Sequence, residues 1–199
     1  MRSKVETGAD KPSYDLGMPL PEQLQEPRVI ILNGPPGVGK STVGRSLAAR
    51  SDKGICIHGD HLGDDGPADC HDGARLASGF IAGGYQLVVF ERCFTDPRGL
   101  RQFQDAYLGA APLFFYTLWA ELDNAQRRDE FRDSKEPLSP DLAEIHTTMA
   151  ADLEGLAPIV YADVRTVSEV IDDILLRCSL GHGRVISTLY DQRAYGDML

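Results

Sequence analysis

The chain has 199 residues, of which 42% are hydrophobic and 25% are charged, a balance typical of one globular domain with or without tails. Acidic side chains outnumber basic ones by 30 to 20, and the net charge of -10 argues against general binding to nucleic acids or anionic membranes. The most apolar run, residues 110–120, is far shorter than the roughly 20 residues that cross a bilayer.

Residues 1–27 are rich in charge and proline and show no periodic apolar pattern. We therefore expect a mobile N-terminal tail, with a short docking strand at residues 16–20 as the alternative. This segment lacks the apolar core that a secretory signal requires. The four cysteines are widely spaced and form no CxxC pair, which favours reduced thiols in a cytoplasmic protein. They are Cys56, Cys70, Cys93 and Cys178.

Five short apolar runs follow the predicted tail, and each predicts a buried strand. Continuous apolar runs, as opposed to strict alternation, are typical of a parallel sheet that is covered on both faces. The predicted strands are residues 28–32, 54–58, 86–91, 112–118 and 158–161.

The segments between these runs carry the start signals of helices. An N-cap residue followed by proline, and a capping box, are typical of a first helical turn. Such starts occur at Asp96 with Pro97, at Ser139 with Pro140, and at Thr166 with Glu169. Strands that alternate with helices predict an α/β fold: a doubly wound, five-stranded parallel sheet with helices on both faces. We assign this domain to residues 28–180, and we assign residues 181–199 to a C-terminal appendage.

A glycine-rich GxxxxGKS loop directly follows the first predicted strand and precedes a predicted helix at residues 41–50. Such a loop curls its backbone N–H groups around phosphate oxygens, and the helix N-terminus adds a positive dipole end. Lys40 would bridge the β- and γ-phosphates, and Ser41 would hold Mg²⁺. We therefore expect ATP and Mg²⁺ as cofactors. The predicted ATP-binding residues are Gly34, Pro35, Pro36, Gly37, Val38, Gly39, Lys40, Ser41 and Thr42.

Two further features narrow the class of phosphate-loop protein. The NKxD motif that Ras-like GTPases use for guanine is absent from the sequence, and the third predicted strand ends in Phe90-Glu91-Arg92 where motor and AAA+ ATPases carry hhhhDE. The class that remains is the small phosphate-loop proteins that transfer phosphate to a bound molecule.

Over residues 28–178 the chain resembles the small P-loop kinases that include shikimate kinase, gluconate kinase, adenylylsulfate kinase and chloramphenicol phosphotransferase. Gly59-Asp60 is similar to a pair that gluconate and adenylylsulfate kinases place after the second strand, and Glu91-Arg92 resembles the Glu-Arg of deoxynucleoside kinases. The resemblance implies an ATP- and Mg²⁺-dependent kinase that phosphorylates a hydroxyl of a small molecule. A nucleoside or nucleotide kinase is one alternative, and an ATP-binding regulator of a protein partner is the other.

We expect the acceptor to bind at the carboxyl ends of the second and third strands. Asp60 is the candidate general base, on the expectation that its strand neighbours the strand of the phosphate loop. Glu91 is either the base itself or, with Ser41, a ligand of Mg²⁺, and Arg92 would bind phosphate or the acceptor. The predicted substrate-binding residues are Asp60, His61, Glu91 and Arg92.

Residues 58–72 are expected to form a solvated acceptor loop. This stretch contains five aspartates and no lysine or arginine, so it would favour a neutral or cationic acceptor over an acid. Its histidines and cysteine do not have the spacing of a zinc finger. Arginines 92, 98 and 101 would offset part of the negative field.

A lid is expected over residues 121–140. Arg128 and Arg132 stand four residues apart on one helix face. In the resembling kinases, lid arginines clamp the phosphate during transfer, which implies catalytic roles for both, beside Lys40 and Asp60. The alternative is a pair of surface arginines that are bridged to neighbouring acids.

Overall fold

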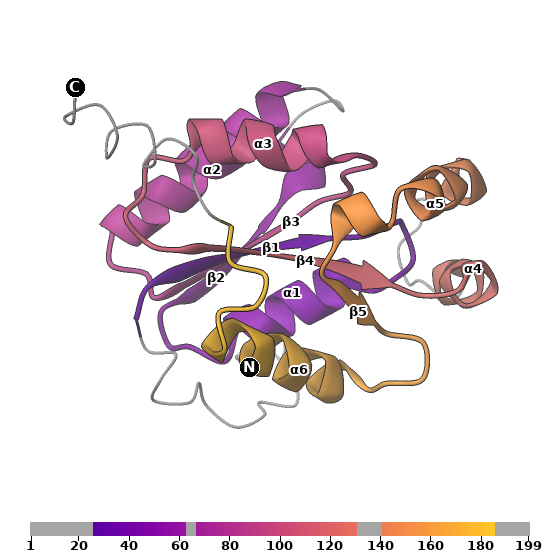
Figure 1. Cartoon of the computed structure of the whole chain (residues 1–199). Helices are drawn as coiled ribbons and strands as arrows, with labels where there is room; N and C mark the ends of the chain where they lie inside the picture. The colour runs from indigo at the N-terminus through magenta and orange to yellow at the C-terminus, as the bar shows by residue number, and fades with distance from the viewer. Residues whose placement is uncertain (1–25, 63–66, 131–140, 186–199) are drawn as a thin grey trace, which may run out of the picture.

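The computed structural model describes residues 26–62, 67–130 and 141–185. Its centre is one parallel sheet with the strand order β2-β3-β1-β4-β5 (Figure 1). The strands are β1 (Arg28–Asn33), β2 (Gly54–His58), β3 (Leu87–Glu91), β4 (Leu113–Trp119) and β5 (Ile159–Tyr161). All five predicted strands are confirmed, with ends that differ from the prediction by one residue at most.

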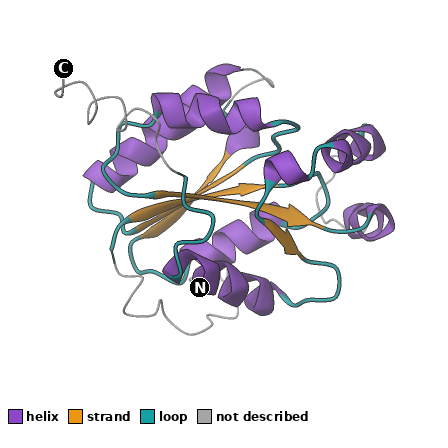
Figure 2. Cartoon of the chain, viewed as in Figure 1, coloured by secondary structure: helices purple, strands orange, loops and turns teal. Residues whose placement is uncertain are grey.

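Helices cover both faces of the sheet (Figures 1 and 2). They are α1 (Lys40–Ala48), α2 (Pro67–Ala82), α3 (Pro97–Ala106), α4 (Leu122–Glu130), α5 (Leu142–Ala151) and α6 (Val167–Ser179), with short 3₁₀ turns η2 (Gly59–His61) and η3 (Glu154–Leu156). Helices α2 and α3 lie on one face, α1 and α6 lie on the other, and α4 and α5 lie beyond the end to which the strands point. The predicted doubly wound α/β fold is thereby confirmed. None of the helices in the described ranges could span a membrane.

The central strand β1 is apolar on both faces because each face packs against a different helical layer. Ile30 and Leu32 belong to the core cluster beneath α1 and α6, whereas Val29 and Ile31 belong to the cluster beneath α2 and α3. All four side chains are fully buried. Burying one such side chain contributes about 1.5–3 kcal/mol to folding, so the run from residue 29 to residue 32 anchors the sheet.

Two of the predicted helix starts are confirmed. The side chain of Asp96 accepts a hydrogen bond from the N–H of Arg98 at 2.7 Å, with Pro97 in the first turn of α3. Thr166 and Glu169 form the reciprocal capping box of α6. The start expected at residues 139–140 lies outside the described residues, and α5 begins at Leu142.

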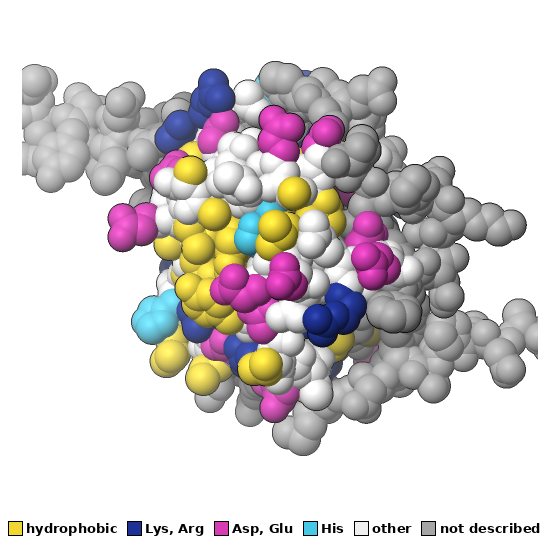
Figure 3. Space-filling view, turned by 90° about the vertical axis from the view of Figure 1, so that its right-hand side faces the viewer, with side chains coloured by type: hydrophobic (Ala, Val, Ile, Leu, Met, Phe, Trp, Pro, Cys, Tyr) yellow, Lys and Arg dark blue, Asp and Glu magenta, His cyan; other side chains and the backbone are white. Residues whose placement is uncertain are grey.

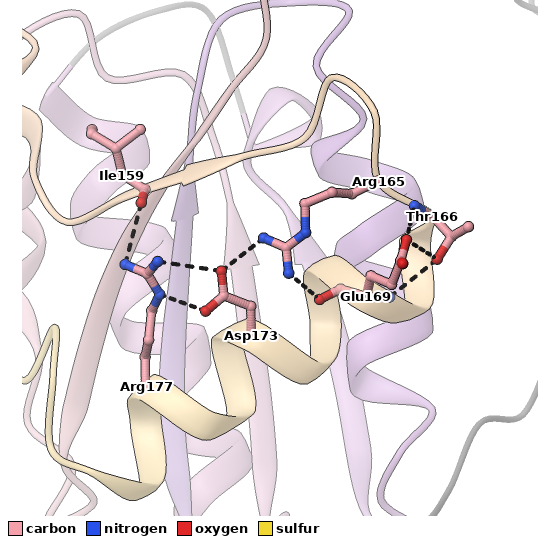
Figure 4. Close-up of polar contacts among 6 residues, drawn as sticks. All are labelled: Ile159, Arg165, Thr166, Glu169, Asp173 and Arg177. Carbon is pink, nitrogen blue, oxygen red and sulfur yellow. Dashed lines mark hydrogen bonds and ion pairs between the residues drawn. The ribbon is translucent and has the colours of Figure 1, made fainter.

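Helix α6 is tied to the strand and loop before it by one carboxylate (Figure 4). Asp173 accepts hydrogen bonds from Arg165 at 2.8 Å and from Arg177 at 2.7 Å, and Arg177 also donates to the carbonyl of Ile159 in β5. Partial burial alone would raise the pKa of Asp173, but the hydrogen bonds from the two arginines outweigh it and lower that pKa. The network therefore fixes the loop that leads from β5 into α6.

Residues 182–185 pair with β4. The N–H of Phe115 donates to the carbonyl of Gly183 at 2.8 Å, and the N–H of Val185 donates to that of Leu113 at 2.9 Å. Strand β5 pairs with β4 only from Thr117 onward, so residues 182–185 cover the earlier part of β4, which β5 leaves unpaired. The start of the expected appendage is thus joined to the sheet.

Two expectations about the region after β2 were wrong. Strand β2 is not next to β1, because the crossover through α2 inserts β3 between them. Residues 67–72 are also not a loop, since they form the first turns of α2. Its buried face consists of small residues, Cys70, Ala74 and Ala77, with Gly73 against the ring of Phe90. Because no large apolar residue marks the first turns of α2, the aspartates dominate the sequence pattern there.

Candidate active site

The glycine-rich loop joins β1 to α1, as predicted. Gly39 occupies the N-cap position of α1 in the left-handed conformation, with φ of 95°, and no side chain caps the helix. The N–H groups of the first turn have no intrahelical partner, and an uncapped helix N-terminus attracts anions. Ser41 and Thr42 stand in this first turn, with Thr42 exposed. The geometry suits a phosphate group.

The loop is held tightly against β4 and α4. Val38 is 1% exposed and belongs to the core beneath α1. A Cβ atom on Gly34 would lie 2.4 Å from the carbonyl oxygen of Leu118, and one on Gly37 would lie 2.4 Å from that of Ala125. The Nζ of Lys40 donates to the carbonyl of Pro35 at 3.1 Å, so the lysine lies back across the loop.

We expect the Gly37→Ala variant to lose about tenfold or more in ATP affinity. The left-handed conformation at this residue, with φ of 78°, costs a non-glycine residue about 1–2 kcal/mol, and the added methyl would also push on α4. Each 1.4 kcal/mol corresponds to about a factor of ten in affinity. Titration calorimetry with ATP measures the loss.

Gly79→Ala is the matched control for that variant. Gly79 lies in α2, and nothing stands within 4 Å of the Cβ atom it would gain. Alanine there should raise the free energy of unfolding by up to about 1 kcal/mol and leave ATP affinity unchanged. Equal ATP affinity in the Gly37 and Gly79 variants would contradict the close fit of the loop.

A polar cluster lies beside the loop, where the carboxyl ends of β2 and β3 meet the first turn of α1. The hydroxyl of Ser41 donates to Oε1 of Glu91 at 2.8 Å, and Nδ1 of His58 contacts the same oxygen. Glu91 is buried, with its side chain 3% exposed, and it stands opposite Leu32 of β1 and His58 of β2 in the sheet register. A hydroxyl and a carboxylate are hard oxygen ligands of the kind that Mg²⁺ prefers. The two residues predicted to hold the ion therefore lie together and fit it.

Asp60 lies in the 3₁₀ turn that follows β2, and its side chain is exposed. The turn is anchored by Arg92, which is 6% exposed and donates from Nη1 to the carbonyl of Gly59 at 2.9 Å. Gly59 itself lies against this arginine, since a Cβ atom there would come within 3.0 Å of the side chain. Arg92 thus supports the predicted base. The side chain of His61 lies outside the described part of the chain.

A cavity of about 520 Å³ opens at the end of β3, within the volume range of small-molecule sites. It is lined by Cys70, Arg92, Cys93, Phe94, Thr95, Asp96, Arg98, Gly99, Gln102 and Ile145. Of the predicted acceptor residues, Arg92 lines it. The sequence analysis missed Thr95, Gln102 and Ile145, and it interpreted Asp96 only as a helix cap. The position of Thr95 in the loop just after β3 was the available signal for that residue.

The predicted lid arginine Arg128 reaches across the nucleotide side of the sheet. It donates to the carbonyls of Ala162 at 2.7 Å, Asp163 at 3.1 Å and Val38 at 3.4 Å. Asp163 in turn accepts from the N–H of Glu121 at 2.8 Å, just before α4. These contacts join α4 to the phosphate loop and to the loop after β5. Arg132, the second predicted arginine, lies outside the described residues.

The side of the molecule on which α4 and α5 lie carries acidic side chains next to an area of hydrophobic ones (Figure 3). Such a surface does not attract a polyphosphate by itself. The local groups that could attract one are the loop N–H groups, Lys40 and the arginines near them.

Together, a GxxxxGKS turn between β1 and α1 and the strand order 2-3-1-4-5 define a P-loop nucleotide-binding domain. No protein-family model matches the sequence, and no curated protein matches it either. Solved structures do match by fold. A sugar kinase from Janibacter sp. HTCC2649 superposes with a TM-score of 0.59 at 15% identity, over 75% of this chain and 93% of that one.

Two other matches belong to the same group of folds. The tunicamycin resistance protein of Deinococcus radiodurans has a TM-score of 0.57 at 15% identity, over 81% of this chain and 99% of its own. The YorR protein of Bacillus subtilis, solved in complex with phosphorylated GDP, has a TM-score of 0.52 at 20% identity, over 76% and 96%. The chain has the P-loop kinase fold, and the resemblance noted in the sequence is confirmed at the level of fold.

Proposed function

We propose that this protein is an ATP- and Mg²⁺-dependent kinase that transfers the γ-phosphoryl group of ATP to a hydroxyl of a small molecule. The observation that carries the proposal is that two sites lie next to each other at the carboxyl end of the sheet. The phosphate loop leaves the end of β1, and the cavity of about 520 Å³ opens at the end of β3, its direct neighbour. All four cysteines are free thiols, which fits a cytoplasmic protein.

The phosphate side of the proposed site has the parts that phosphoryl transfer needs. The loop N–H groups and Lys40 would hold the β- and γ-phosphates, and Arg128 stands close enough to the loop to join them when a nucleotide is present. Mg²⁺ would be held by Ser41 and Glu91 and would neutralise charge on the phosphates. Because Ser41 donates its hydrogen to Glu91, the lone pairs of its oxygen are left for the ion.

Asp60 is the better candidate for the general base, and Glu91 the better candidate for the metal. Glu91 is buried, and one of its oxygens already contacts both Ser41 and His58. Asp60 is exposed on a turn that a buried arginine holds in place. A base must reach the acceptor hydroxyl, and an exposed carboxylate at the carboxyl end of the sheet is better suited to that role than a buried one.

The acceptor is expected to be neutral or cationic. The described walls of the cavity carry Asp96 beside Arg98, and these two form an ion pair at 2.7 Å, so that the charge of Arg98 is offset. The buried Arg92 is engaged by the carbonyl of Gly59. With the aspartates of residues 60–72 nearby in sequence, the field favours acceptors without a carboxylate.

Asp96→Asn should shift this preference toward acidic acceptors by about fivefold, the factor that corresponds to roughly 1 kcal/mol between close charges in water. The measurement compares kcat/KM for an amino sugar and for a sugar acid of similar size. The shift should shrink as salt rises, because the Debye length falls below about 8 Å above physiological ionic strength. Asp52→Asn, an exposed aspartate in the turn before β2, is the matched control. A sugar acid preferred by the unmodified protein would contradict the charge assignment.

The test of the proposed function is ADP formation across a panel of acceptors. The panel holds neutral sugars, sugar acids, amino sugars, nucleosides, nucleotides and hydroxyl-bearing antibiotics. We expect ADP release to rise with one class of acceptor and to need Mg²⁺. A rise with nucleosides or nucleotides alone would favour the nucleoside kinase alternative. ADP release that no acceptor changes would favour an ATP-dependent regulator.

A further inference from the structure

His58 ends β2 at the edge of the proposed metal site. Its Nδ1 contacts Oε1 of Glu91, the oxygen that also accepts the hydroxyl hydrogen of Ser41 at 2.8 Å. The two strands set this contact, because His58 and Glu91 are direct partners in the parallel register of β2 and β3. One carboxylate oxygen therefore joins the first turn of α1 to two strand ends.

The chemistry of the contact fixes which atom carries the hydrogen. An ionised carboxylate only accepts hydrogen bonds, so Nδ1 of His58 donates. Glu91 is 3% exposed and His58 is 25% exposed at the side chain, so both bonds to the carboxylate are partly shielded from bulk water. Hydrogen bonds to an ionised acceptor are stronger than neutral ones, and a low local dielectric strengthens them further. Two such donors on one oxygen hold the Glu91 side chain in a single orientation.

On the face of β2 that carries His58, the side chains change from apolar packing to hydrogen bonding at the proposed metal site. Residues two apart on a strand face the same side, so Cys56 and His58 share a face of β2. Cys56 lies against α1 at Gly44, and burial, followed by the charge of Glu91, raises the pKa of its thiol to about 12. Cys56 therefore stays a neutral packing residue, while the next residue on its face is a hydrogen-bond donor aimed at the carboxylate.

Resting on the proposed function, we propose that His58 is a positioning residue that orients Glu91 for the binding of Mg²⁺ with ATP. Groups that orient metal ligands through a hydrogen bond are typically worth about 10–100-fold in metal affinity or activity. In this role His58 acts through Glu91 and does not touch the substrate.

The test measures ATP affinity of the full chain by calorimetry, once with Mg²⁺ and once with EDTA. His58→Leu should leave the affinity in EDTA unchanged and reduce the gain that Mg²⁺ brings by about 10–100-fold. His58→Asn should restore most of the gain, because its amide nitrogen stands near the place of Nδ1. His71→Asn, an exposed histidine of α2, is the control and should behave as the unmodified protein.

The outcomes separate the positioning role from the proposed function. If Mg²⁺ does not change the ATP affinity of the unmodified protein, the proposed function itself fails. If it does, and His58→Leu keeps the full gain, the positioning role is overturned. Should His58→Leu fail to fold by thermal melting, His58→Asn and His58→Gln decide. Glutamine places its amide nearer the position of Nε2, so equal Mg²⁺ gains in these two variants would overturn the role, and a loss in the glutamine variant alone would support it.

Discussion

Lys40→Ala should abolish measurable phosphoryl transfer while the fold survives. The side chain contacts only the backbone carbonyl of Pro35 among the hydrogen bonds found in the described residues, and it belongs to none of the described core clusters. Its removal takes one positive charge from the phosphates in transfer. Losing a single preorganised donor to developing charge costs about 10²–10³-fold in kcat, and we expect at least that. Turnover, ATP affinity and thermal melting should be measured on one preparation.

Lys53→Ala is the control for the loss of a lysine as such. Lys53 is exposed in the turn before β2, at the amino end of the strands, whereas the phosphate loop lies at their carboxyl end. Its removal should leave turnover within about twofold, as expected for a surface substitution away from the site. Near-normal turnover in the Lys40 variant would refute the kinase assignment at its strongest point.

Asp60→Asn should reduce transfer to the acceptor by roughly 10²–10⁴-fold, the range for a lost general base. ATP binding should persist, because Asp60 lies on the turn after β2 and the phosphate loop lies after β1, with β3 between. The amide keeps the size of the carboxylate and removes its ability to take a proton. Single-turnover rates at saturating acceptor measure the effect.

Glu91→Gln separates the two candidate bases. If Glu91 organises Mg²⁺, this variant should need more Mg²⁺ and recover turnover at saturating ion. Asp72→Asn, an exposed aspartate of α2, is the neutral comparison for the loss of one acidic charge. If Glu91→Gln stays more damaging than Asp60→Asn at saturating Mg²⁺, the base is Glu91.

The fold could be predicted because its signals are local. A run such as residues 29–32, buried on both sides, is typical of a central parallel strand, and the loop at residues 34–41 marks the strand and helix that flank it. The caps at Asp96 and Thr166 are also local, since each bonds to a backbone N–H within three residues. The five strands and these two helix starts therefore followed from neighbouring residues, whereas the start of α2 did not.

The arrangement of the candidate site could not be predicted in the same way. The order of the strands depends on how the helices that connect them pack against the sheet, which involves residues far apart in the sequence. The expectation that β2 lies next to β1 was therefore wrong. The contact of His58 with Glu91 exists because β3, which ends in Glu91, is the direct neighbour of β2, and no spacing in the sequence encodes it. The cavity likewise combines residues of the loop after β3, of α3 and of α5, such as Arg92, Gln102 and Ile145, and the sequence does not show that these segments meet.

The proposed kinase activity is tested most directly by following the fate of the γ-phosphoryl group. ATP labelled at that group is incubated with the protein, Mg²⁺ and the acceptor class found by the panel, and the products are separated by chromatography. We expect the label to move to an organic phosphate ester, Lys40→Ala to prevent this transfer, and Lys53→Ala to leave it intact. Label found only in inorganic phosphate, at a rate that no acceptor changes, would contradict the claim that this protein is a kinase.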